Sequence, residues 1–264
     1  MGNFETLIIH DEAQVRTIQM NRPERRNAIN ATMIAELGRA LDQAAVDDCA
    51  VVILTGAGNA FCAGVDLDHL QRMHSATPDE KQEDTQRLAD LLRALYDFPK
   101  PTIAAVNGAA IAGGTGLATV CDFTLAVPAA KFGYTEVRIG FIPAIVASFL
   151  LLQVGEKKAR DLLLTGRLIE ADEAWSLGLV TKVVPDAELM TEARNLAQSL
   201  LQNSPQAMAR VKRLLSAFTR ATLDAEIAEA IEQNAEARQT PDFEEGIRAF
   251  LEKRKPVWPS LKKG

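Results

Sequence analysis

The sequence predicts a layered α/β protein built from repeated strand–strand–helix units and followed by a helical C-terminal region. Three observations carry this prediction. Short apolar or β-branched runs alternate with stretches of helical periodicity through the first two thirds of the chain. Glycine-rich loops follow two of the apolar runs. After about residue 187 the pattern becomes helical, so we expect a core over residues 1–187 and a helical region over residues 188–264, which packs either against the core or against a neighbouring subunit.

The first expected elements are two short strands, over residues 7–9 and 15–20. Asn30 is placed to cap a helix, because apolar side chains follow it at spacings of three and four residues. The apolar run over residues 51–54 ends at Thr55-Gly56, which is typical of a buried strand that runs into a loop. This order of elements gives the first strand–strand–helix unit.

A second cycle follows the first. It comprises an amphipathic helix around residues 88–95, a strand over 102–106, a helix over 113–119 and a strand over 123–127.

In the last third, helices are expected over residues 189–201, 205–218, 223–235 and 243–254. Ser204-Pro205 is a helix start signal, since serine caps and proline suits the first turn.

Composition excludes several classes of protein. The chain has 264 residues, of which 47% are hydrophobic and 24% charged, so it is globular. A net charge of -6 and an aromatic content of 5% argue against nucleic acid as a partner. The apolar stretch 103–121 is interrupted by glycines, which argues against a membrane helix. The three cysteines, Cys49, Cys62 and Cys121, are widely spaced, and we expect buried free thiols in a cytoplasmic protein.

Several short motifs fail as functional sites. Gly56-Ala-Gly58 lacks the third glycine of a dinucleotide fingerprint. The ligand-type residues of Asp66-Leu-Asp68-His69 lie on one short segment and are not expected to converge, so no metal site is predicted. The three histidines have no serine or cysteine partner in a nucleophile-elbow motif. Dinucleotide binding, metal binding and nucleophilic hydrolysis are therefore poorly supported.

Two loops of small residues are more informative. One covers residues 61–67 and the other residues 107–116, and each follows a predicted strand. Small residues let a backbone approach a ligand closely, and free N–H groups at a helix start favour developing negative charge. One backbone donor from each loop could form an oxyanion hole. The spacing is equally compatible with glycines that only permit tight helix–strand packing.

A set of ordered motifs resembles the enoyl-CoA hydratase/isomerase (crotonase) family over nearly the whole chain. They are Asn21-Arg-Pro-Glu-Arg-Arg-Asn-Ala-Ile-Asn30, Val51 to Leu67, Lys100-Pro-Thr-Ile-Ala-Ala-Val-Asn-Gly108, Gly113 to Asp122, Lys131 to Pro143, Leu163-Leu-Thr-Gly166, Ala171 to Val180 and Phe250-Leu-Glu-Lys-Arg-Lys255. The resemblance implies a ClpP/crotonase-type fold of ββα units with a C-terminal helical trimerisation region. It also implies a homotrimer or a hexamer that is a dimer of trimers.

The resemblance assigns roles to individual residues. The N–H groups of Val65 and Gly113 would form the oxyanion hole for an acyl-CoA thioester. The segment Ala63, Gly64, Val65, Asp66 and Leu67 would cradle CoA, with Arg26, Phe250 and Lys253 as further CoA contacts. In the family the last helix can come from the adjacent subunit. No cofactor is implied beyond the coenzyme A that enters with the substrate.

The family's hydratases use two glutamates, and the sequence retains one of them. Glu136 matches the first, whereas the second position is Gly116, which leaves an expected open volume. Without its surrounding motif, Glu136 would read as a solvated carboxylate at a strand end. The resemblance favours an enoyl-CoA hydratase; the alternatives are a double-bond isomerase that uses one glutamate and an acyl-CoA-binding homologue with lapsed catalysis. A helical scaffold without a ligand is the remaining option.

Overall fold

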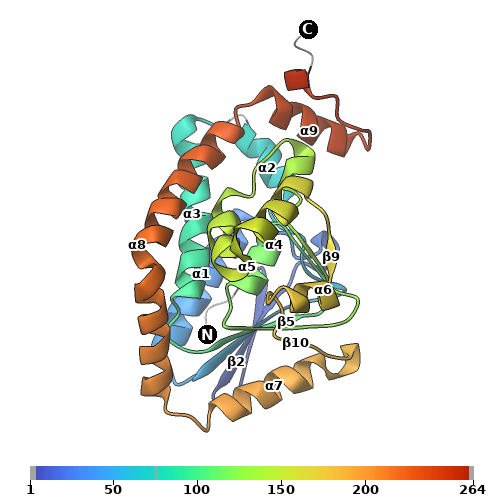
Figure 1. Ribbon diagram of the computed structural model, residues 1–264. Helices are drawn as coiled ribbons and strands as arrows, with labels where there is room; N and C mark the ends of the chain where they lie inside the picture. Colours follow the sequence, from blue (N-terminus) through green and yellow to red (C-terminus); the bar gives the residue numbers. More distant parts are fainter. Residues whose placement is uncertain (1–3, 75, 262–264) are drawn as a thin grey trace.

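Two β-sheets lie at the centre of the computed structural model, which describes residues 4–74 and 76–261 (Figure 1). The larger sheet has the strand order β1-β2-β3-β5-β7-β10, and the smaller sheet has the order β4-β6-β8-β9. The larger sheet contains β1 (Leu7–Glu12), β2 (Val15–Met20), β3 (Val51–Gly56), β5 (Thr102–Val106), β7 (Phe123–Ala126) and β10 (Lys182–Val183). The smaller one contains β4 (Ala60–Cys62), β6 (Ala109–Ile111), β8 (Lys131–Gly133) and β9 (Ile169–Glu170).

Each strand–strand–helix unit divides its two strands between the two sheets. In the pairs β3/β4, β5/β6 and β7/β8, the first strand joins the larger sheet and the second joins the smaller. The strands β4, β6 and β8 are neighbours and run parallel, so their carboxyl ends lie at the same edge. The predicted α/β architecture of repeated units is confirmed.

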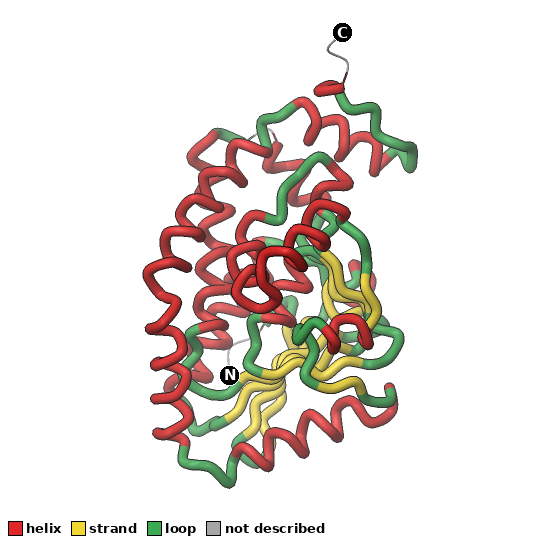
Figure 2. Tube along the Cα trace, viewed as in Figure 1, coloured by secondary structure: helices red, strands yellow, loops and turns green. Residues whose placement is uncertain are grey.

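Helices cover the sheets on several sides (Figure 2). The first helix, α1 (Ala31–Val46), begins as predicted, because the side chain of Asn30 accepts a hydrogen bond of 2.8 Å from Met33 N–H. The other helices are α2 (Leu67–His74), α3 (Pro78–Tyr96), α4 (Gly113–Thr119), α5 (Ala144–Thr165), α6 (Ala171–Ser176), α7 (Leu189–Leu200), α8 (Pro205–Ala237) and α9 (Pro241–Leu251). Short 3-10 turns are η1 (Pro23–Arg25), η2 (Glu136–Ile139), η3 (Asp186–Glu188) and η4 (Pro259–Leu261).

The C-terminal helices pack directly against the core. In Figure 1, α7 lies below the larger sheet and α8 runs along α3 and α5 at the left. The two helices predicted over 205–218 and 223–235 are wrong, because α8 is one continuous helix. Contacts with α3 hold the helix at the expected break, because Tyr96 Oη lies 3.4 Å from Thr219 Oγ1 and Arg93 pairs with Asp224 at 2.7 Å.

The main core fills the space between the sheets and helices, and a smaller apolar cluster lies apart from it. Cys49, Cys62 and Cys121 are buried free thiols, as predicted. The smaller cluster contains Leu70, Phe141, Phe243 and Ile247, and it joins α2, α9 and the segment after η2. Across the described residues, none of the helices combines the length and apolar character needed to cross a membrane.

Candidate active site

The three parallel strands β4, β6 and β8 each lead into one predicted catalytic group. The chain reaches Val65 after β4, Gly113 after β6 and Glu136 after β8. All three residues line one cavity of about 550 Å³. Ligands commonly bind beyond the carboxyl ends of parallel strands, and this cavity lies at such an edge. The smaller sheet therefore brings together three groups that are far apart in the sequence.

Val65 and Gly113 offer backbone N–H groups to this cavity. Neither N–H donates to an acceptor within the described part of the chain. Gly113 is the first residue of α4, where N–H groups have no partner inside the helix. The preceding residue, Ala112, has φ 54°, a value that L-residues rarely adopt. Its N–H donates to Gly133 O at 2.7 Å, and this bond holds the strained turn in place.

Gly64 allows the two loops to approach each other. It has φ +86°, and a Cβ atom there would lie 2.8 Å from Ile111 O and 2.9 Å from Ala112 Cβ. A side chain at this position would push the loops apart. The glycine thus keeps the N–H groups of Val65 and Gly113 close enough to address one ligand atom, which is the geometry an oxyanion hole needs.

Glu136 is the one carboxylate lining the cavity that has no ion-pair partner among the described residues. It opens the η2 turn, and its Oε2 is buried without a hydrogen-bond partner among the described residues. Burial raises the pKa of Glu136 to about 7, because removal from water disfavours the charged form. A group with this pKa can both accept and donate a proton near neutral pH.

The open volume expected at Gly116 does not exist. A Cβ atom at this position would lie 2.5 Å from Val146 Cγ1 and 3.7 Å from Leu92 Cδ1. Val146, on α5, therefore fills the space in which a second carboxylate would lie. The prediction of a vacant site was wrong because sequence alone does not show which side chain of another helix faces a glycine.

Two exposed arginines lie at the rim of the cavity. Arg25 and Arg26 are exposed and line it, and Arg25 pairs with Asp68 at 2.9 Å. The carboxylate of Asp66 is already engaged, since it pairs with Arg22 at 3.0 Å and accepts from Asp68 N–H. Arg26 is thus available for a phosphate, whereas Asp66 shapes the loop.

The remaining predicted contacts divide into two groups. Ala63, Val65, Leu67 and Phe250 line the cavity, and Phe250 comes from the same chain. Gly64, Gly116 and Lys253 are not among the lining residues. The last helix, α9, is held against η2 by a close backbone approach, because a Cβ at Gly246 would lie 2.2 Å from Ile139 O.

Comparison with known proteins identifies the family of this chain. The sequence profile of the enoyl-CoA hydratase/isomerase family matches residues 10–261. The chain belongs to this family. A Thermus thermophilus member, provisionally named an enoyl-CoA hydratase, is 44% identical over 93% of this chain and 98% of its own. The 1,2-epoxyphenylacetyl-CoA isomerase of Escherichia coli is 35% identical over 96% of this chain and 98% of its own.

A solved structure of another member shows the same fold. The enoyl-CoA hydratase/isomerase from Xanthobacter autotrophicus superposes with a TM-score of 0.88 and 31% identity. The superposition covers 96% of this chain and 98% of the other. The fold expected from the resemblance to the enoyl-CoA hydratase/isomerase family is therefore confirmed.

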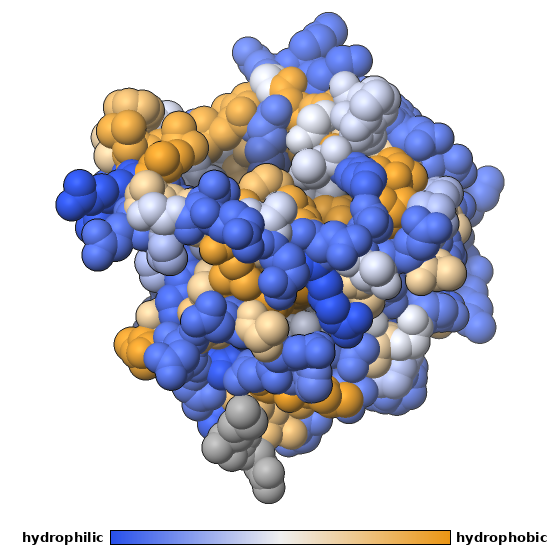
Figure 3. Space-filling model, turned by 90° about the horizontal axis from the view of Figure 1, so that it is seen from below, coloured by the Kyte–Doolittle hydropathy of each residue, from blue (hydrophilic) through white to orange (hydrophobic). Residues whose placement is uncertain are grey.

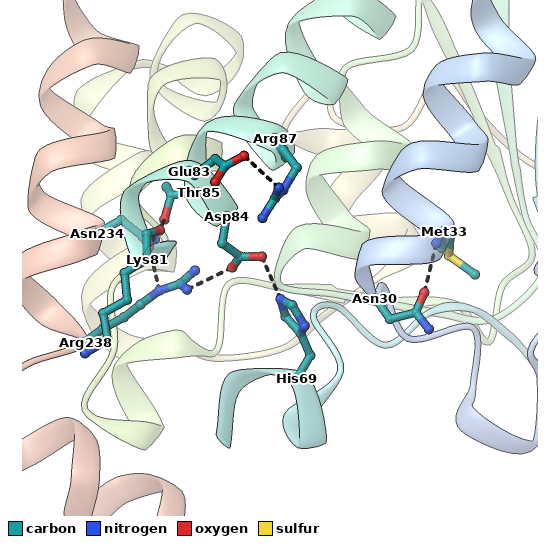
Figure 4. A network of polar contacts seen from close by, with 10 residues as sticks. All are labelled: Asn30, Met33, His69, Lys81, Glu83, Asp84, Thr85, Arg87, Asn234 and Arg238. Carbon is teal, nitrogen blue, oxygen red and sulfur yellow. Dashed lines mark hydrogen bonds and ion pairs between the residues drawn. The ribbon is translucent and has the colours of Figure 1, made fainter. Parts of the chain in front are cut away.

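A buried polar cluster that the sequence did not predict lies at the inner end of the cavity (Figure 4). Thr85 on α3, Asn234 on α8 and Arg238, the residue that ends α8, line this end, and Asp84 accepts a hydrogen bond from Arg238. Asp84 and Arg238 are separated by 154 positions in the chain. The signal in the sequence is that Asn234 continues the apolar stripe Leu223, Ile227 and Ile231 of α8, with Arg238 one turn further on; it indicates buried polar groups but not their partners.

Proposed function

We propose that this protein acts on acyl-CoA thioesters through a stabilised enolate, and that its reaction is the hydration of a 2-enoyl-CoA. The observation that carries the proposal is the convergence of Val65 N–H, Gly113 N–H and the Glu136 carboxyl on one cavity. The two N–H groups would hold the thioester oxygen as negative charge develops on it. The exposed arginines at the cavity mouth would bind the CoA phosphates.

A single carboxyl suffices for hydration when the same group first accepts a proton from water and then donates it to the substrate. The Glu136 carboxylate takes a proton from water as the water oxygen bonds to C3. The C2–C3 electron pair moves into the thioester and forms the enolate, whose oxygen accepts hydrogen bonds from Val65 and Gly113. The carboxylic acid then returns the proton to C2. The pKa of about 7 supports this cycle, because both forms of Glu136 are populated at neutral pH.

Double-bond isomerisation is a second candidate, which the apolar environment of Gly116 favours. Val146 occupies the space of a second carboxylate, so no second acidic group at this position orients water. In isomerisation, Glu136 removes a proton from C2 of a 3-enoyl-CoA and returns it to C4, and no water takes part. The 1,2-epoxyphenylacetyl-CoA isomerase relative supports a rearrangement on this scaffold.

Turnover assays separate these candidates. Purified protein is supplied with crotonyl-CoA and with 3-hexenoyl-CoA, and absorbance of the conjugated thioester is followed. Loss of absorbance indicates hydration, and a gain indicates isomerisation. Glu136→Gln should abolish either reaction while CoA binding stays nearly unchanged, because the amide keeps the shape and loses proton transfer. Tight CoA binding without turnover of either substrate would instead identify an acyl-CoA-binding homologue.

We also propose that α8 forms part of a trimer or hexamer interface. Val211, Leu214, Leu215 and Phe218 follow one face of the helix, and each is more than half exposed in the single chain. Viewed from below, apolar side chains gather at the left edge of the molecule, the side on which α8 lies in Figure 1 (Figure 3). An exposed apolar face of this kind is typical of a subunit contact.

A further inference from the structure

The inner end of the cavity is polar, although the walls leading to it are apolar. Leu92 lies against the Gly116 position, and Leu88 lines the cavity one turn further along α3. Thr85 follows on the same face, next to Asn234 and Arg238 of α8. Helix α3 rises by about 10 Å between Leu92 and Thr85. An acyl chain that extends along α3 from the catalytic centre would therefore end at these polar groups.

We call Asp84, Thr85, Asn234 and Arg238 the distal polar cluster; each is at least 94% buried. Both carboxylate oxygens of Asp84 are engaged, because one accepts from His69 Nε2 at 2.7 Å and the other from Arg238 Nη1 at 2.8 Å. Burial alone would raise the pKa of Asp84, but these two bonds lower it below its ordinary value. Asp84 is therefore ionised, and it neutralises the Arg238 guanidinium.

The acceptors of the distal polar cluster are occupied, whereas two of its donors are free. Asn234 Oδ1 accepts from Arg238 Nε at 3.1 Å, which fixes the orientation of the amide. Thr85 Oγ1 lies 2.9 Å both from this oxygen and from Lys81 O, and its single proton is shared between the two acceptors. Asn234 Nδ2 and Arg238 Nη2 have no acceptor among the described residues, and both residues line the cavity. The free groups at this end are thus N–H donors.

Charge at this end favours an anion. The Arg238–Asp84 pair carries no net charge. The buried Lys81 on α3 lies beside the distal polar cluster (Figure 4), and no carboxylate in the described ranges 4–74 and 76–261 pairs with it. We propose that the distal polar cluster selects acyl-CoA substrates whose acyl group ends in a carboxylate. This carboxylate would accept hydrogen bonds from Asn234 Nδ2 and Arg238 Nη2. The inference rests on the proposed function, since it concerns the acyl end of the same cavity.

Binding of saturated thioesters tests the inference without any turnover. Calorimetry compares suberoyl-CoA with octanoyl-CoA, and adipoyl-CoA with hexanoyl-CoA, which differ only in the terminal carboxylate. Hydrogen bonds to a charged group favour the dicarboxylate of at least one pair by about 10- to 100-fold in Kd. The same preference in kcat/KM is expected for 2-octenedioyl-CoA over 2-octenoyl-CoA, or for the corresponding six-carbon pair.

Asn234→Asp supplies the decisive variant. An aspartate has nearly the same shape and still accepts from Arg238 and Thr85, but it replaces the free amide donor by a negative charge. The preference for the dicarboxylate should disappear, while the Kd of butyryl-CoA, whose acyl chain is too short to reach position 234, stays within about twofold and reports an intact fold. Gln233→Glu is the matched control, because it makes the same chemical change at the neighbouring, exposed position of α8 and should leave the preference intact.

The outcomes distinguish this inference from the proposed function. Equal Kd values within both pairs of thioesters would overturn the inference. The distal polar cluster would then only stabilise the packing of α8 against α3. A preference that survives Asn234→Asp would also overturn it. If neither 2-enoyl-CoA nor 3-enoyl-CoA thioesters turn over, the proposed function fails, yet a preference for suberoyl-CoA that Asn234→Asp removes would still support the inference.

Discussion

Replacing Glu136 by glutamine should change how the stability of the protein depends on pH. Burial raises the pKa of this carboxyl from 4.5 to about 7 in the folded protein. In the unfolded chain it has its ordinary pKa. Between these two values the unfolded chain loses the proton while the folded protein keeps it, so rising pH favours unfolding. Above pH 7 both states are ionised, and the effect is constant.

The magnitude follows from the two pKa values. A pKa difference of about 2.5 corresponds to about 3 to 4 kcal/mol, at about 1.4 kcal/mol for each pKa unit. The wild type should lose this much stability relative to Glu136→Gln between pH 4.5 and pH 7. Both proteins contain the same other titratable groups, so these cancel in the comparison.

Urea denaturation at fixed protein concentration, followed by circular dichroism at pH 5, 6, 7, 8 and 9, measures the difference. The free energy of unfolding of Glu136→Gln minus that of the wild type should increase up to about pH 7 and then level off. Glu24→Gln removes an exposed carboxyl from another short 3-10 turn and should give a curve parallel to the wild type. Parallel curves for Glu136→Gln as well would refute the assignment of Glu136 as a buried group that titrates near neutrality.

Three further changes test other parts of the site. Gly113→Pro removes an oxyanion-hole N–H and should lower kcat by about 100- to 1,000-fold, whereas Gly113→Ala keeps the N–H and should retain most activity; equal rates would exclude this donor. Gly116→Glu alone should not increase crotonyl-CoA hydration, because its Cβ collides with Val146, but combined with Val146→Ala it should; a gain from the single variant would show that the helices adjust freely. Leu215→Glu should reduce the mass measured by light scattering to that of a smaller assembly, and an unchanged mass would place the interface elsewhere.

Local signals in the sequence predicted most of the fold. The cap at Asn30, the strand over residues 51–54 and the glycine-rich start of α4 all lie where they were expected. The break predicted between residues 218 and 223 fails for a tertiary reason. Thr219 and Thr222 are weak helix formers, yet packing of α8 along α3 overrides that preference.

The sequence predicted only those site residues that lie within a recognisable family motif. Val65, Gly113 and Glu136 occur in ordered motifs, and the structure brings them to one cavity. The contact of Val146 with Gly116 and the Asp84–Arg238 ion pair join residues from different helices. Such contacts depend on how the helices pack, and a single sequence holds no periodicity or spacing that encodes them.

The position of the three groups after adjacent strands has a consequence for redesign. Neighbouring strands lie about 4.8 Å apart, so main-chain pairing of β4, β6 and β8 sets the spacing of the segments that carry Val65, Gly113 and Glu136. Two of the three groups are themselves main-chain N–H groups, which survive almost any substitution other than proline. The side chains of α3 and α8 that line the cavity can therefore be exchanged to change which acyl groups are accepted, while the two main-chain donors proposed for the oxyanion hole stay in place.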